Sequence, residues 1–338
     1  MTIRALIFGI GTSLIFLNPK LSSNEIFPYY ALALPLFNYS KRIILIIFVI
    51  LLFGIINQII FNDSRSVINA IQIAVLLATL YAVQTMCIIE LRLISKIFNI
   101  FILMHLSICI FQYIYPESMN LSYWFFSSRE SQVEQLLLRS AVVGLGPEPA
   151  YVASLLCGML LFSILLNGFN FLIISMVVIQ LFLLKSVVGY ILFFIIFNFF
   201  ILKFKKYKYL IIMVIITLIS LFSGLMERLS IYISNVYTMG SIFSAEVSTG
   251  STRLANLRES LELIISFPGI GFSPFGAISY AMHGSIFASI IILAMFKIKI
   301  NALEFMVGLA VFIFFGPILI WPMYYLLTPY FLNSISKK

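Results

Sequence analysis

The sequence has little charge for its length. Of its 338 residues, 21 are lysine or arginine and 12 are aspartate or glutamate, whereas 62% are hydrophobic. A water-soluble domain has too little interior to bury that much apolar surface, so the composition excludes one. The chain instead offers repeated apolar runs of about 20 residues, the length that a helix needs to cross a bilayer core of roughly 30 Å. We therefore expect an all-α, polytopic integral membrane protein.

Cysteine and histidine are also scarce, with three and two copies. Cys87, Cys109 and Cys157 lie inside apolar runs, where free cysteine behaves as a small hydrophobe, so we expect neither a disulfide nor a metal site. The two histidines belong to no cluster at metal-ligand spacing. Gly144 and Gly146 form no phosphate loop, because no Gly-Lys-Ser/Thr motif follows them. The sequence therefore predicts no cofactor.

Apolar segments follow one another along the whole chain, without a separate soluble domain or an internal repeat. Lipid offers the backbone no hydrogen-bond partners, and runs of this length favour helices over barrel strands. We expect about 11 or 12 transmembrane helices in a single domain, 1–338, with long loops at 116–147 and 226–282. The expected spans lie near residues 4–17, 25–39, 42–61, 66–89, 96–115, 149–166, 171–184, 188–202, 209–225, 284–296 and 302–332.

Basic residues in the short loops predict the orientation, because lysine and arginine accumulate on the cytoplasmic side of a membrane. With Arg4 inside, one set of basic residues shares that side and needs only anionic headgroups as partners, so no nucleic acid partner is expected. This set comprises Lys41, Arg42, Arg92, Lys96, the run 203–208, Lys297, Lys299, Lys337 and Lys338. Both long loops then face the outside, which is the periplasm in a bacterium.

Arginines gather on the outer side, against the usual bias. The planar guanidinium can grip phosphate or carboxylate with two hydrogen bonds, which lysine cannot do. Either these arginines pair with glutamates of the same loops, or some of them bind an anionic substrate. They are Arg65, Arg129, Arg139, Arg228, Arg253 and Arg258.

The stretch GLGPEPAYVA, residues 144–153, places Glu148 between two prolines at the start of an apolar run. Pro149 suits the first turn of a helix, where a missing N–H costs nothing, and Glu148 would face the positive end of the helix dipole. One interpretation is that Glu148 caps this helix. The other is that its carboxylate, held at the membrane surface near Arg139, helps to form a polar site. The two interpretations are compatible.

The second long loop contains an expected amphipathic helix, because Leu254, Leu257, Leu261 and Ile264 recur at helical spacing. Arg253 falls in its first turn, where a cation opposes the helix dipole. Capping therefore does not explain Arg253. Either it is solvated, or it joins the free backbone amides of the helix start in holding an anion.

The two histidines lie in different settings. His283 follows Arg253 in the second long loop and lies beside the span near residue 284. A near-neutral imidazole in that place can take a proton from a hydroxyl, or it can be a buried, hydrogen-bonded filler. His105 lies in the middle of an apolar span, and the filler interpretation applies to it more strongly.

Three short elements, taken in order, resemble a known family. GPEP opens a helix, KSVVG at 185–189 lies between two spans, and Arg253 is followed by a helix, the turn PGIG and His283. In this the chain resembles the bacterial O-antigen polymerases and their relatives the O-antigen ligases. The resemblance covers residues 139–290 and, in hydropathy, most of the chain. It implies the all-helical fold of C-type glycosyltransferases, acting at the periplasmic face of the inner membrane.

Carried over by position, the resemblance assigns Arg139, Arg253 and Arg258 to binding of a diphosphate, and Glu148, Arg253 and His283 to catalysis. The implied reaction moves a growing glycan from undecaprenyl diphosphate to another lipid-linked repeat unit. A diphosphate leaves readily once its developing charge is neutralised, and the acceptor hydroxyl needs orientation and proton removal. The implied partners are the undecaprenyl-diphosphate-linked oligosaccharide, membrane lipids, and a flippase and chain-length regulator of the same pathway.

Other functions fit the same composition. A ligase would transfer the glycan to the lipid A core, and GPEP favours the polymerase over it. A flippase or other transporter would carry charges within its spans. Lys185 and His105 are the main candidates for that, and Lys185 is expected at a span end, where it can reach the interface. A purely structural subunit would tolerate replacement of the outer arginines.

Overall fold

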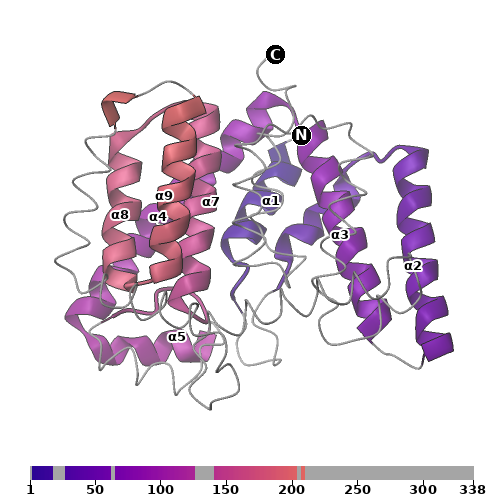
Figure 1. Ribbon diagram of the computed structural model, residues 1–338, viewed down its shortest axis with the longest axis horizontal. Helices are drawn as coiled ribbons and strands as arrows, with labels where there is room; N and C mark the ends of the chain where they lie inside the picture. Colours follow the sequence, from indigo (N-terminus) through magenta and orange to yellow (C-terminus); the bar gives the residue numbers. More distant parts are fainter. Residues whose placement is uncertain (1, 18–26, 62–64, 126–140, 204–206, 210–338) are drawn as a thin grey trace, which may run out of the picture. The chain divides into compact units, whose positions relative to one another are not determined.

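The computed structural model describes residues 2–17, 27–61, 65–125, 141–203 and 207–209 (Figure 1). Every regular element in these ranges is helical, and no strand occurs among them. They fall into two compact units, of which one holds the described residues of 1–37 and 86–209 and the other those of 38–85. The expectation of a helical protein is confirmed for this part of the chain.

The first unit is built around α4, and we call it the α4 unit. In its described residues, three 3-10 helices of eight, three and three residues accompany the α-helices. The elements are α1 (Thr2–Ser13), η1 (Tyr29–Leu36), α4 (Ile88–Ile114), η2 (Pro116–Ser118), α5 (Met119–Phe125), α7 (Pro149–Asn167), α8 (Phe171–Leu184), α9 (Val187–Lys203) and η3 (Tyr207–Tyr209).

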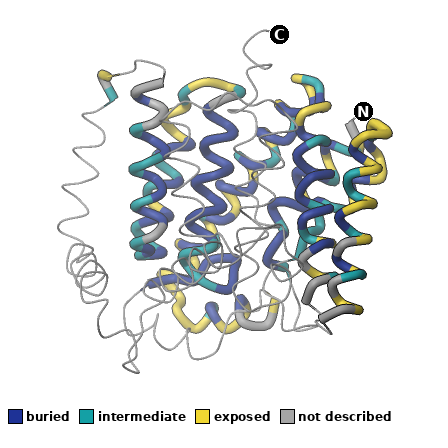
Figure 2. The backbone as a smooth tube through the Cα atoms, turned by 45° about the vertical axis from the view of Figure 1, so that its right-hand side comes forward, coloured by how far each residue is buried: buried dark blue, intermediate teal, exposed yellow. Residues whose placement is uncertain are grey.

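The core of this unit is α7, which packs against α4, α8 and α9. Every residue from Val152 to Ile164 is buried, and Figure 2 shows this helix in dark blue over nearly its whole length. A helix that is apolar on all sides belongs inside a larger assembly of helices. The Phe98 and Phe162 rings meet edge to face, with centroids 5.4 Å apart, where α4 and α7 pack together.

Contacts between side chains fix the direction of α7 relative to α4. Asn167, the last residue of α7, bonds to Ser95 near the start of α4. Gly144, which precedes α7, bonds to Gln112 near the end of α4. The two helices are therefore antiparallel.

The other two helices alternate in the same way. Gln180, near the end of α8, bonds to His105 in the second half of α4, so α8 runs parallel to α4. Gly189, at the start of α9, lies against Cys157 in the first half of α7, so α9 runs parallel to α7. One end of the unit thus carries the starts of α1 and α4, and we call it the Arg4 end. The opposite end carries Glu148, and we call it the Glu148 end.

Local sequence signals set the helix boundaries here. Pro149 occupies the first position of α7, which Gly168 follows with a φ of 80°. The Asn170 side chain caps α8 by accepting from the N–H groups of Leu172 and Ile173, at 3.0 and 3.5 Å. Proline at a helix start, glycine after its end and asparagine at an N-cap are the residues that these positions favour.

The second unit contains α2 (Lys41–Phe61) and α3 (Arg65–Thr85), which pack against each other. Tyr39, just before α2, lies near Tyr81 of α3, with ring centroids 5.6 Å apart. Large apolar side chains are exposed along one face of α2, and an exposed face of this kind suits contact with lipid. They are Ile44, Leu45, Phe48, Val49, Leu52, Ile55 and Ile59.

By length and composition, one helix in the described part, α4, is long and apolar enough to cross a membrane. Its 27 residues extend about 40 Å at 1.5 Å per residue, more than the roughly 30 Å of a bilayer core. The other apolar helices found among these residues are shorter.

Several expected boundaries are wrong. The expected span 25–39 contains the 3-10 helix Tyr29–Leu36, with Pro35 inside it. The expected span 66–89 ends at Thr85, because a new helix begins at Ile88. Arg92 and Lys96, expected in a short loop, therefore lie on exposed positions in the first turns of α4. Sequence hydropathy misses this break because apolar residues flank it on both sides.

The stretch 116–147 was expected to be a long loop, and parts of it have defined structure. It begins with η2 and α5. Residues 141–147 are buried. Residues 126–140 lie outside the described part of the chain.

Candidate functional site

Glu148 lies at the start of α7, as the sequence predicts. Its backbone is extended, with φ −142° and ψ 145°, and its carbonyl accepts from the N–H groups of Tyr151 and Val152 at 3.1 and 3.2 Å. The side chain makes no capping hydrogen bond. Glu148 is thus the N-cap residue by position, but its carboxylate does not cap the helix. The interpretation in which this carboxylate belongs to a polar site remains a prediction.

Residues 141–147, which lead to Glu148, are buried although they are not helical, and we call them the buried segment. Gln112 of α4 accepts at Oε1 from the Gly144 N–H, at 2.8 Å. Ser122 of α5 donates its hydroxyl to the Gly144 carbonyl, at 2.9 Å. Buried backbone outside a helix needs such partners, because its N–H and C=O groups have no intrahelical ones.

His105 of α4 contacts the next residue of the buried segment. Its Nε2 lies 3.1 Å from the Leu145 nitrogen, and its Nδ1 lies 2.6 Å from Oε1 of Gln180 in α8. Gln180 in turn donates its amide N–H groups to the carbonyls of Ile102 and Met176, at 3.1 and 3.0 Å. The interpretation of His105 as a buried, hydrogen-bonded residue is confirmed.

The KSVVG motif lies at the same end of the unit as Glu148. Lys185 ends α8 in the left-handed conformation, with φ 48° and ψ 39°, so its expected place at a helix end is confirmed. Just before it, the Leu183 carbonyl accepts from the Val142 N–H at 3.1 Å, which ties this turn to the buried segment. The Ser186 hydroxyl then accepts from the Gly189 N–H, at 3.1 Å.

A glycine is required at position 144 of the buried segment. Its φ is 68°, and a Cβ there would overlap the imidazole of His105. Gly146 is also crowded, since a Cβ on it would meet Val152 and Phe16. The two glycines therefore allow the chain to pass closely between α4 and the start of α7.

A polar cluster between α4 and α7 was missed by the sequence analysis. The Ser95 hydroxyl donates to Ser163 at 3.0 Å, and the Ser163 hydroxyl donates to Asn99 Oδ1 at 2.8 Å. The Asn167 amide donates to Ser95 at 2.7 Å. The sequence did contain a signal for this cluster, because its polar residues recur four positions apart inside apolar runs and so share one helix face. The pairs are Ser95 with Asn99 and Ser163 with Asn167.

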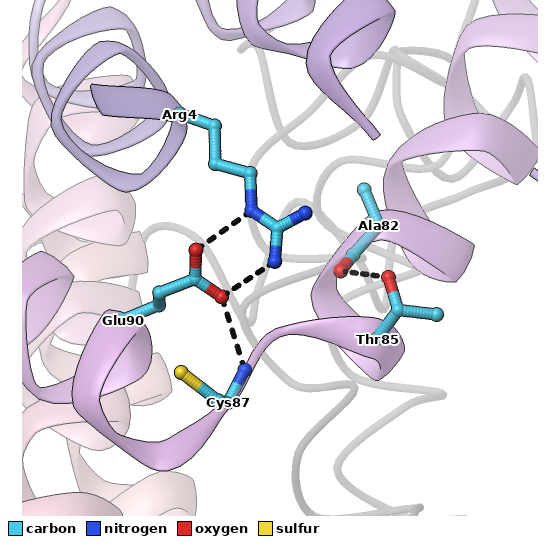
Figure 3. A network of polar contacts seen from close by, with 5 residues as sticks. All are labelled: Arg4, Ala82, Thr85, Cys87 and Glu90. Atoms are coloured by element: carbon cyan, nitrogen blue, oxygen red, sulfur yellow. Dashed lines mark hydrogen bonds and ion pairs between the residues drawn. The ribbon is translucent and has the colours of Figure 1, made fainter. Parts of the chain in front are cut away.

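An ion pair at the Arg4 end was also missed. Arg4 of α1 donates from Nε and Nη2 to the two carboxylate oxygens of Glu90, at 2.6 and 2.8 Å (Figure 3). The Cys87 N–H donates to Glu90 Oε2 at 3.1 Å, in a capping box that starts α4. The guanidinium also lies over the Phe37 ring, 4.6 Å from its centroid. Arg4 was predicted only to mark the cytoplasmic side, although Cys87-x-x-Glu90 has the spacing of a capping box.

Of the predicted site residues, the described part of the chain contains Glu148, which lies at the same end of the unit as the turn that carries Lys185. The remaining predicted site residues lie outside the described part of the chain, and their roles stay predictions. They are Arg139, Arg253, Arg258 and His283. Among the described residues, no three histidines, cysteines or acidic residues group closely enough to hold a metal ion.

The Glu148 end brings together a half-buried carboxylate, a lysine at a helix end and a rigidly hydrogen-bonded backbone. A fixed carboxylate can accept a hydrogen bond from a hydroxyl and can take its proton. A lysine can attract a phosphate as a point charge. No protein-family model, no curated protein and no solved structure matches this chain.

Proposed function

We propose that the protein is an integral membrane polymerase of the O-antigen type. It would transfer a growing glycan from undecaprenyl diphosphate to another lipid-linked repeat unit. The observation that carries the proposal is that two of the motifs behind the resemblance lie at the same end of the α4 unit. GPEP opens α7 and KSVVG follows the end of α8, yet a hydrogen bond from the Val142 N–H to the Leu183 carbonyl joins the segments just before the two motifs. Two of the three elements on which the resemblance rests thus belong to one end of one helical unit.

Features of the surface and the interior of the described helices support a location in the membrane. The exposed apolar face of α2 suits lipid, and the irregular buried segment has its hydrogen bonds supplied by neighbouring side chains. We place the chain in the bacterial inner membrane as a multi-pass protein. Arg4, Arg92, Lys96 and Lys203 belong to the Arg4 end, which we assign to the cytoplasm because basic residues accumulate there.

The Glu148 end would then face the periplasm, where lipid-linked repeat units are joined. In the proposed reaction, the bond between the anomeric carbon of the donor and the diphosphate oxygen breaks. A new bond forms from that carbon to a hydroxyl oxygen of the acceptor sugar, and the hydroxyl proton leaves. Glu148 would orient that hydroxyl and accept its proton. Arg139, Arg253 and Arg258 would neutralise the departing diphosphate, with His283 as a second candidate for handling the acceptor.

A transporter is the second candidate function, and one observation favours it. Charged residues inside transporter spans usually mark a path for an ion or substrate. Glu90 is a carboxylate that is only 1% exposed in its pair with Arg4, and the polar but uncharged ring of His105 is fully buried in the same helix. Both residues are matched by protein partners. Such pairing suits helix packing as well as transport.

The test is an assay with purified protein in nanodiscs, supplied with undecaprenyl-diphosphate-linked repeat units and no nucleotide sugar. We expect a ladder of glycan lengths from the natural protein, and its loss in Glu148→Ala and Arg253→Ala. A Glu117→Ala variant is the matched control, because Glu117 is exposed at the same end of the unit.

Each alternative gives a different result in the same preparation. Transfer of glycan to added lipid A core, without a ladder, would support a ligase. Movement of lipid-linked repeat units across sealed vesicles, without any new glycosidic bond, would support a transporter. A ladder that survives both substitutions would contradict the assigned roles of Glu148 and Arg253.

A further inference from the structure

We infer that His105 is a positioning residue, which sets the place of the Glu148 carboxylate through the backbone of Leu145. His105 is fully buried in α4, and only two residues, Gly146 and Pro147, separate Leu145 from Glu148. The inference rests on the proposed function for the role of Glu148. The geometry that links the two residues is independent of that function.

The contacts of Gln180 fix the protonation of the imidazole. Both amide hydrogens of Gln180 are used by the carbonyls of Ile102 and Met176. Its Oε1, 2.6 Å from His105 Nδ1, is therefore an acceptor, and Nδ1 must carry the hydrogen. On the other side of the ring, the Leu145 N–H is a donor 3.1 Å away, so Nε2 must be the bare acceptor. The contacts are satisfied together only by a neutral imidazole with its hydrogen on Nδ1.

A second side chain holds the neighbouring peptide in the same way. Gln112 lies seven residues after His105, on the same face of α4, and accepts from the Gly144 N–H. Its amide nitrogen donates to the Ser122 hydroxyl at 2.7 Å. Two consecutive backbone N–H groups, those of Gly144 and Leu145, are thus bound to two side chains of one helix.

The chain between Leu145 and Glu148 has little freedom to absorb a movement. Gly146 has no room for a Cβ, because Val152 and Phe16 lie against it. The ring of Pro147 fixes its own φ, and Pro149 restricts Glu148 to the extended backbone that it adopts. A shift of the Leu145 peptide is therefore passed on to Glu148. Loss of the His105 contact should misplace the carboxylate without removing it.

The first test is the tautomer itself. The chain has two histidines, so protein labelled with nitrogen-15 in histidine gives the signals of two imidazoles, and His283→Gln identifies those of His105. We expect His105 to be neutral with its hydrogen on Nδ1, and Gln180→Ala to weaken that preference, because the Leu145 N–H then remains as one of the two contacts that set it. A hydrogen on Nε2, or a charged ring, in the natural protein would overturn the inference. This test needs no enzymatic activity, so it stands even if the proposed function fails.

The second test compares His105→Ala with His105→Gln, whose amide oxygen can reach the place of Nε2. The matched control is Ser95→Ala, which removes buried hydrogen bonds from the same helix but contacts α7 at the Arg4 end. Amide hydrogen exchange of residues 141–148 is measured in each variant. We expect exchange at least about tenfold faster in His105→Ala, partial recovery in His105→Gln, and little change in Ser95→Ala.

The polymerase assay provides the functional readout. A misplaced carboxylate should lower kcat about tenfold or more while KM changes little, since orientation acts on the reacting state. The same fall in kcat in Ser95→Ala, at equal thermal stability, would overturn the positioning role and leave a merely structural one. If the natural protein shows no activity at all, the proposed function fails and the exchange experiment still decides the inference.

Discussion

Arg4 and Glu90 form a two-point ion pair, in which Nε and Nη2 of the guanidinium face the two carboxylate oxygens at 2.6 and 2.8 Å. The arginine side chain is 21% exposed, whereas that of the glutamate is 1% exposed. The carboxylate therefore depends on its protein partners for solvation. This pair attaches α1 to the start of α4, two elements that are far apart in the sequence.

Arg4→Ala should destabilise the protein strongly, because it removes the charged partner of a buried carboxylate and leaves it, among the described residues, with Cys87. Removing one member of a buried pair typically costs about 3–5 kcal/mol. Arg4→Ala combined with Glu90→Gln should recover a substantial part of that loss, since no charge is then left buried. Thermal unfolding in one detergent gives the comparison. Arg92→Ala is the control on an exposed arginine of the same end, and an equal loss in this control would contradict the prediction.

Gly144→Ala should destabilise more than Gly168→Ala, by about 1–3 kcal/mol. Both glycines have positive φ, of 68° and 80°, so alanine is strained at either position. A Cβ at Gly144 would also overlap His105, whereas nothing lies within 4 Å of a Cβ at Gly168. Both variants carry the backbone strain, so the difference between their unfolding midpoints measures the effect of crowding at position 144. Equal losses would mean that the buried segment can move away from α4.

The polar cluster of α4 and α7 should give a small but measurable coupling. A double-mutant cycle with Asn99→Ala and Ser163→Ala should yield about 0.6 kcal/mol and not more than about 1.7, the values typical of hydrogen bonds between membrane helices. The cycle of Asn99→Ala with Asn170→Ala is the control, because Asn170 bonds only to the start of α8 among the described contacts. Coupling of similar size in the control cycle would show that the effect is not specific to the cluster.

Glu148→Gln should lower the turnover of the proposed polymerase by about 10²–10⁴-fold, the usual contribution of a general base, with a smaller effect on KM. Glutamine keeps the size of the side chain and removes its negative charge. Single-turnover measurements with lipid-linked repeat units provide the rates. Glu117→Gln, an exposed glutamate of the same end, should leave turnover unchanged. A Glu148→Gln variant with normal turnover would remove the carboxylate from the mechanism.

The helices α7, α8 and α9 could be predicted closely from the sequence. Their apolar runs are bounded by residues with strong local preferences, as Pro149, Gly168 and Asn170 show. The start of α4 could not be predicted from hydropathy. It follows the end of α3 after Met86 and Cys87, inside a continuous apolar stretch, and it is marked by a capping box with cysteine in place of the usual serine or threonine.

Less of the candidate site could be predicted. The position of Glu148 follows from its flanking prolines, because proline restricts the backbone on both sides. The partners of the buried segment do not follow, since Gln112 and Gly144 are distant in the sequence and one sequence carries no record of their contact. His105 and Gln112 did show a visible pattern, with two polar residues separated by two helical turns in an apolar run. That pattern indicates a buried polar face but does not say what binds to it.

Each element that packs against α4 bonds to a different polar residue of that helix. Glu90 bonds to α1, Ser95 and Asn99 bond to α7, His105 bonds to α8, and Gln112 bonds to the chain before α7. In lipid, apolar side chains gain little by leaving their surroundings for one another, so they do not distinguish one helix register from the next. A slip of one turn would leave several buried polar groups unmatched at once.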